Sequence, residues 1–141
     1  MTDLQTAENN LEGHTICLCK EGKCLFSEKR GIAPMMDFIA DGLDFSGYCV
    51  ADSVVGKAAA LLFVKCKIKS VFAKTLSLSA KKVLEMYGID YMYETLAERI
   101  INREGTDICP MEKAVWDTDD PEEAYAILQD KLSSIRNKNG K

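Results

Sequence analysis

The chain has 141 residues, 47% of them hydrophobic and 28% charged, which fits a single globular domain with a sizeable core. Its formal net charge of −4 and its isoelectric point of about 5.1 exclude a general nucleic-acid surface, which needs a basic stripe, so we expect no nucleic-acid partner. The longest uncharged apolar stretch, residues 58–64, is too short to cross a bilayer, and residues 1–13 lack a signal-peptide pattern, so we expect a cytoplasmic protein with no membrane partner.

The first half of the chain predicts a tail, a hairpin and a helix. Residues 1–13 are polar and acidic, and we expect a flexible tail there. Residues 14–20 and 24–27 read as two strands joined by a tight turn in which Gly22 supplies a positive φ. A helix follows, with Pro34 in its first turn and Gly42 at its end.

The second half alternates strands with helices. The patterns predict, in chain order, a strand at 47–51, a helix at 53–66 that is apolar nearly all round, a strand at 70–73, a helix capped by Ser77 or Ser79 and ended by Gly88, a strand at 91–93, a helix begun by the capping box of Thr95 and Glu98, a short helix from Cys109, and an amphipathic helix over 119–135. Strands separated by helices pair in parallel through right-handed crossovers. We therefore expect a three-layer α/β fold with a mixed five-stranded sheet, a single domain over residues 14–136, and a flexible C-terminal tail at 137–141.

This order of elements resembles the cytidine deaminase-like fold, a mixed five-stranded sheet opened by a hairpin. In the zinc deaminases one helix begins with His or Cys followed by x-Glu, and another begins Pro-Cys-x-x-Cys. The corresponding runs here are Ala-Pro-Met-Met-Asp at 33–37 and Asp-Ser-Val-Val-Gly at 52–56. The three zinc ligands and the proton-shuttling Glu are missing, so the resemblance implies the topology without deaminase activity. We expect no metal and no cofactor.

The chain resembles more closely a small bacterial family known as domain of unknown function 1893, over residues 14–132. The runs that carry this resemblance are Arg-Gly-Ile-Ala-Pro at 30–34, Ala-Asp-Ser-Val-Val-Gly-Lys-Ala-Ala-Ala at 51–60, Asn-Arg-Glu-Gly-Thr-Asp-Ile-Cys-Pro-Met-Glu at 102–112, and Asp-Asp-Pro-Glu-Glu-Ala-Tyr at 119–125. It implies the deaminase-like fold and no established activity.

The six cysteines do not predict a disulfide scaffold, because no secretory signal accompanies them. We expect reduced, buried thiols at the four cysteines that fall on apolar strand or helix positions, namely Cys17, Cys19, Cys49 and Cys66. A tetrahedral zinc site is also not expected, because Cys17, Cys19 and Cys24 lack the C-x-x-C spacing and the sole histidine is His14.

The joint between the strand at 47–51 and the next helix is the first candidate site. Asp52 and Ser53 stand where an N-cap is wanted, and the free N–H groups of the helix, with Gly56 and Lys57, favour a phosphate or a nucleotide-like ligand. The full G-x-x-x-x-G-K-[ST] phosphate loop is absent, and the Asp52 carboxylate repels an anion but suits ribose hydroxyls. The simpler interpretation is that Asp52 or Ser53 only caps a buried helix.

Two polar segments are candidates for the rim of this site. Arg30 and Gly31 precede the first helix, and Arg103, Thr106 and Asp107 belong to a polar loop broken by glycine. An arginine holds a carboxylate or a phosphate with two hydrogen bonds. The alternative is an ordinary surface loop whose Asp107 caps the helix that follows.

Two other classes of function stay open. A hydrolase or transferase would use Cys109 or the carboxylates of Asp37 and Asp52. A helix N-terminus favours the thiolate form of a cysteine such as Cys109, and the negative charges of Asp107 and Glu112 oppose that effect. A protein-interaction module would use the 119–135 helix or a sheet edge, and a homo-oligomer is compatible with the sequence. The leading hypothesis is a zinc-free binding domain for a nucleotide-like or phosphorylated small molecule.

Overall fold

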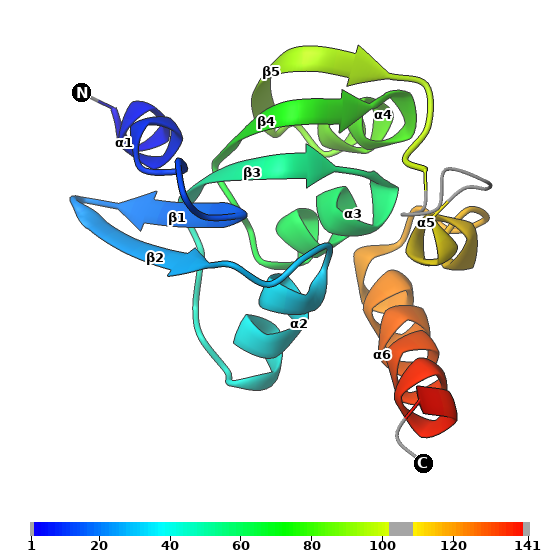
Figure 1. Ribbon diagram of the computed structural model, residues 1–141. Helices are drawn as coiled ribbons and strands as arrows, with labels where there is room; N and C mark the ends of the chain where they lie inside the picture. Colours follow the sequence, from blue (N-terminus) through cyan, green and yellow to red (C-terminus); the bar gives the residue numbers. More distant parts are fainter. Residues whose placement is uncertain (1, 102–108, 140–141) are drawn as a thin grey trace.

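The computed structural model describes residues 2–101 and 109–139, and its centre is a mixed five-stranded sheet (Figure 1). The spatial order of the strands is β2-β1-β3-β4-β5; β1 is antiparallel to both neighbours, and β3, β4 and β5 are parallel. Their bounds are β1 Ile16–Lys20, β2 Lys23–Ser27, β3 Cys49–Val55, β4 Ser70–Ser77 and β5 Asp90–Ala97. The predicted α/β class and mixed sheet are confirmed.

Helices cover both faces of the sheet, but very unequally. Their bounds are α1 Asp3–Asn9, α2 Ala33–Ala40, α3 Lys57–Lys65, α4 Leu78–Met86, α5 Pro110–Ala114 and α6 Pro121–Asn139. On one face α3 packs against α4 and α6, and the apolar side of α2 joins the same core. On the other face α1 contacts β1, β3 and β4. None of the helices in the described ranges combines the length and the apolar character that a membrane crossing requires.

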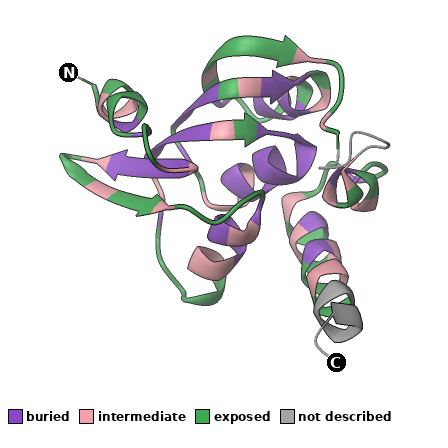
Figure 2. Cartoon of the chain, in the orientation of Figure 1, coloured by how far each residue is buried: buried purple, intermediate pink, exposed green. Residues whose placement is uncertain are grey.

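The main core lies between the sheet and α3. Figure 2 shows α3 as buried along nearly its whole length, as the apolar run between its two terminal lysines predicts. The opening strand β1 is buried on both sides: Ile16 and Leu18 point to this core, while Cys17 and Cys19 point to α1.

The predicted hairpin, the α2 helix and the start of α4 are confirmed. The hairpin turn places Glu21 at φ 50° and Gly22 at φ 82°, the left-handed conformation that two-residue hairpin turns require. Pro34 lies in the first turn of α2, and the Ser77 hydroxyl caps α4 by accepting the amide of Ala80 at 3.0 Å. Each of these signals is local, which is why the sequence carries it.

The prediction of a flexible tail over residues 1–13 is wrong, because α1 forms there. Thr2 and Gln5 make a reciprocal capping box at its start. Ala7 and Leu11 are fully buried against the sheet face that carries Cys17, Ala51 and Phe72. Two apolar side chains are enough to hold this polar segment in place as a helix, because the sheet supplies the surface that they pack against.

The predicted boundary between strand and helix at Asp52 is also wrong. The strand β3 continues to Val55, so Asp52 and Ser53 lie inside it, and the N-cap of α3 is Gly56. Parallel pairing with β4 extends through Val54 and Val55, and this ladder outweighs the local capping preference of Asp and Ser.

The predicted helix starting at Thr95 is wrong for the same reason. Residues Asp90–Ala97 form one strand, β5, in which Thr95 pairs with Thr75 and Leu96 with Leu76 of β4. A capping-box pattern is satisfied only where the chain leaves the sheet, and here the ladder continues past it.

The C-terminal helix begins as predicted but runs further. Asp120 accepts the amide of Glu122 at 3.0 Å, as the Asp-Pro-Glu start predicts. Because α6 extends to Asn139, the predicted tail at 137–141 is wrong for residues 137–139, and residues 140–141 lie outside the described ranges.

One of the four thiols expected to be reduced is not free. Cys19 forms a disulfide with Cys24, its direct partner across the hairpin, whereas Cys17, Cys49, Cys66 and Cys109 are free. Hairpin register brings the two Cα atoms to 4.2 Å. Their separation of five residues gives no such signal in sequence.

Candidate functional site

A cavity of about 320 Å³ opens where β3 ends and α3 begins. Five segments of the chain form its wall: the loop before β1 at Thr15, the loop before α2 at residues 30–32, the β3–α3 joint, Ile100 after β5, and residues 109–112 at the start of α5. A position at the carboxyl end of a parallel strand is where α/β proteins usually bind ligands. The volume is at the lower end of the range for small-molecule sites, so it suits one small ligand.

Most of the wall is apolar. It is formed by six aliphatic side chains, Ile32, Val54, Ala58, Ala59, Ile100 and Met111. Apolar walls favour the binding of a ligand that has flat or hydrophobic faces, while a few polar groups fix its orientation. The polar groups here are those of Thr15, Arg30, Asp52, Ser53, Cys109 and Glu112.

Among the polar groups of the wall, the Asp52 carboxyl is the one whose pKa burial shifts most. Its side chain is only 6% exposed. Burial raises the pKa of its carboxyl from 3.8 to about 8, although the backbone amides of Ser53 and Val54 oppose the rise. At neutral pH most molecules therefore carry a protonated Asp52, which has both a hydrogen-bond donor and an acceptor.

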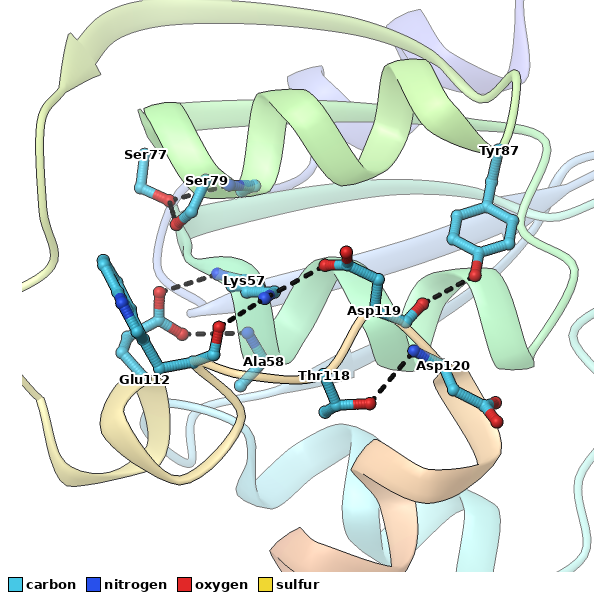
Figure 3. A network of polar contacts seen from close by, with 11 residues as sticks. Lys57, Ala58, Ser77, Ser79, Tyr87, Glu112, Thr118, Asp119 and Asp120 are labelled. Atoms are coloured by element: carbon cyan, nitrogen blue, oxygen red, sulfur yellow. Dashed lines mark hydrogen bonds and ion pairs between the residues drawn. The ribbon is translucent and has the colours of Figure 1, made fainter.

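Glu112 occupies the N-terminus of α3. Its carboxylate oxygens accept the backbone amides of Lys57 at 2.7 Å and Ala58 at 2.8 Å (Figure 3). Gly56, the N-cap, offers no side chain of its own, and a Cβ built on it would stand 2.5 Å from this carboxyl group. Burial raises the pKa of Glu112, while the two amides and the Lys57 ammonium oppose that rise. The chain therefore supplies its own anion at the place predicted for phosphate.

The side chain of Lys57 takes part in a network of hydrogen bonds and an ion pair. Its ammonium group donates to the carbonyl of Trp116 at 2.9 Å and forms an ion pair with Asp119 at 3.0 Å. The backbone carbonyl of Asp119 in turn accepts the Tyr87 hydroxyl at 2.6 Å, as Figure 3 shows. Lys57 thus joins α3 to the segment between α5 and α6, and it does not line the cavity, contrary to the prediction.

The remaining predicted residues divide into three groups. The cavity wall includes Arg30, Gly31, Asp52, Ser53, Gly56 and Cys109. Asp37 instead lines a separate hollow with Tyr125 and Gln129 and pairs with Lys29, so the structure does not bring Asp37 and Asp52 together in one site. Arg103, Thr106 and Asp107 lie outside the described residues.

Sequence reasoning missed the role of Glu112 in this site. Its position three residues after Cys109 suggested a cap for its own helix α5. Its partners lie more than fifty residues earlier, and no local pattern encodes that contact. The available signal is indirect: a buried helix that begins at a glycine needs a cap from elsewhere.

The comparisons with known proteins agree on one family. The sequence profile described as Domain of unknown function (DUF1893), TM1506, matches residues 7–132. The crystal structure of a DUF1893 family protein (TM1506) from Thermotoga maritima superposes with a TM-score of 0.83 at 28% sequence identity, covering 93% of this chain and 91% of that one. No match was found among curated proteins.

Proposed function

The chain belongs to the DUF1893 family, and for this member we propose a function as a binding domain for one small nucleotide-like ligand in the cavity above the start of α3. The observation that carries the proposal is Asp52, a buried carboxyl group that holds its proton and lies in an otherwise largely apolar wall.

The ligand chemistry follows from this wall. A protonated carboxyl group donates one hydrogen bond and accepts another in one plane, which matches the paired donor and acceptor on the edge of a nucleobase. The aliphatic side chains suit the faces of such a ring. A cavity of about 320 Å³ suits a base with its sugar better than a dinucleotide.

A phosphate group would sit at the rim and away from the helix N-terminus. Glu112 already fills the first amides of α3, and a phosphate there would meet its carboxylate. Arg30 is exposed, lines the cavity and pairs well with phosphate oxygens. The ligand's base would therefore lie at Asp52 and any phosphate at Arg30.

Isothermal titration calorimetry with nucleosides, nucleoside monophosphates and inorganic phosphate tests the proposal. We expect at least one nucleoside or nucleotide to bind, and Asp52→Ala to weaken that binding at least tenfold. Asp37→Ala is the matched control, since this carboxylate lies in a different hollow, and it should leave the affinity unchanged.

Arg30→Ala separates the two parts of the ligand. It should lower the affinity for nucleoside monophosphates and leave the affinity for nucleosides unchanged. Affinity should also fall as the pH rises past about 8, because the ligand needs the protonated Asp52. The proposal fails if no compound of the panel binds below millimolar concentration, or if Asp52→Ala binds as tightly as the wild type.

A thiol-based transferase or hydrolase is the second candidate, because Cys109 lines the same cavity as Asp52 and Glu112. Its thiol is free and half-buried, and it precedes Pro110 at the start of α5. Iodoacetamide labelling at neutral pH tests it: fast labelling of Cys109 that a cavity ligand blocks supports this candidate, and labelling no faster than at Cys66 rejects it. The protein-interaction module and the homo-oligomer stay predictions.

A further inference from the structure

Three sulfur atoms gather between the hairpin and α1, on the sheet face opposite the main core. Cys17 and Cys19 point to the same side of β1, and Cys24 of β2 is the direct partner of Cys19. All three sulfur atoms lie within 4.8 Å of one another, and the Cys17 Sγ is 3.5 Å from the Cys19 Sγ. Within residues 2–101 and 109–139, no other trio of His, Cys, Asp or Glu side chains comes as close.

The disulfide explains only two of these three sulfur atoms. Hairpin register brings Cys19 opposite Cys24, and Cys17 is not part of the bond between them. Cys17 is fully buried, and burial raises the pKa of its thiol to about 11, so the free thiol is protonated at neutral pH. A protonated, buried thiol is a poor nucleophile, which argues against a role for Cys17 in disulfide exchange.

We propose that the reduced cluster of Cys17, Cys19 and Cys24 is a binding site for a soft, thiophilic metal ion of the Cu(I) class. Cysteine sulfur is the ligand that such ions prefer. The described residues supply three ligands and no fourth, which suits a three-coordinate ion and not the four-coordinate structural site that zinc adopts.

The spacing of the sulfur atoms fits this coordination. A metal–sulfur bond of about 2.3 Å places the three ligands of a planar site about 4 Å apart. The sulfur atoms already lie within 4.8 Å of one another. Only Cys19 and Cys24 must separate, because a disulfide holds its two sulfur atoms closer than a shared metal would.

The surroundings favour a soft ion and give it a way in. Ala7, Leu11, Ala51 and Phe72 form an apolar cover that brings no oxygen or nitrogen ligands. Cys24 is only partly buried and lies on β2, an edge strand of the sheet. The ion would therefore meet Cys24 first and then the two buried sulfur atoms.

The chemistry has two steps. A thiol reductant first opens the disulfide: two reductant thiols join in a new disulfide, and Cys19 and Cys24 take up their two protons. The ion then binds, and each sulfur that coordinates it as a thiolate releases one proton to water.

Competition with a chromophoric Cu(I) chelator under anaerobic conditions tests the site. We expect the reduced wild type to take one Cu(I) per chain, and Cys17→Ala to bind it at least tenfold more weakly. Cys66→Ala is the matched control, because Cys66 is also a free, partly buried thiol but lies outside the cluster. The oxidised wild type, with its disulfide intact, should bind Cu(I) more weakly than Cys17→Ala, because Cys17 is then the one thiol left in the cluster.

Two results would overturn the proposal: a reduced wild type that takes no Cu(I), or a Cys17→Ala variant that matches it. If Cys17→Ala does not fold by circular dichroism, X-ray absorption of the reduced, Cu(I)-loaded wild type decides. Three sulfur neighbours at about 2.3 Å support the site, and two sulfur atoms or any nitrogen or oxygen neighbour reject it. The nucleotide proposal concerns another cavity on the other face and does not depend on the outcome.

Discussion

The first backbone amides of α3 and of α4 are capped in two different ways. Helix α3 is buried along most of its length and α4 along one face, and both leave amide groups at their first turn that need acceptors. The α4 start is capped by Ser77, three residues before the amide it accepts, whereas the α3 start is capped by Glu112, which follows its amides by 54 and 55 residues (Figure 3). The first cap stabilises a helix, and the second also holds α5 against α3 and shapes one side of the cavity.

Gly56→Ala should break the distant cap most severely. Its Cβ would stand 2.5 Å from the Glu112 carboxyl group, so the carboxylate must leave the two amides or the backbone must move. The backbone angles of Gly56 suit any residue, so the effect is steric. We expect a loss of about 3 kcal/mol in the free energy of unfolding, measured by urea denaturation. A loss below about 0.5 kcal/mol would show that α5 is free to shift.

Glu112→Ala should cost about 2 kcal/mol, because two buried amides lose a charged acceptor. Glu122→Ala is the control: its carboxylate pairs with Lys65 but is 71% exposed, so little stability should be lost. Equal losses in the two variants would contradict the role given to Glu112. Denaturation with the same urea series compares them directly.

The stability of the protein should fall as the pH rises toward 8. The folded chain keeps the Asp52 proton up to about pH 8, while the unfolded chain releases it near pH 3.8. Between these two values the free energy of unfolding therefore falls as the pH rises. For one proton the slope is at most about 1.4 kcal/mol per pH unit. Asp52→Asn should reduce the slope measured between pH 5 and 8. The raised pKa of Glu112 acts in the same direction, so some slope should remain.

Ser77→Ala should have the smallest effect, about 1 kcal/mol, as is usual for the loss of a local side-chain cap. Ser79→Ala is its control, because Ser79 contacts Ser77 but caps no amide. The cavity should keep its ligand affinity in Ser77→Ala and lose it in Gly56→Ala. A matching loss in both would mean that the two helix starts are not independent.

The same contrast between local and distant contacts explains which parts of the molecule could be predicted. The hairpin turn, the Pro34 start of α2, the Ser77 cap and the Asp-Pro-Glu start of α6 were predicted correctly, because each signal and its effect lie within a few residues. The predictions at Asp52 and Thr95 were wrong, because pairing along β4 extended both neighbouring strands past a local cap signal.

The candidate site shows this division at single residues. Sequence alone marked Arg30, Asp52, Ser53 and Cys109, since acids, hydroxyls and thiols beside strand and helix ends are conspicuous. It also marked Lys57 as a ligand residue, but packing turned that side chain to Asp119.

By itself the sequence determined the α/β order, the turns and the chemical groups available to a site. Only the tertiary structure decided that Glu112 closes α3, that Asp52 loses its water and keeps its proton, and that three sulfur atoms meet beneath α1. The reason is physical: caps and turns depend on neighbours along the chain, while desolvation and contact depend on what the folded chain brings close in space.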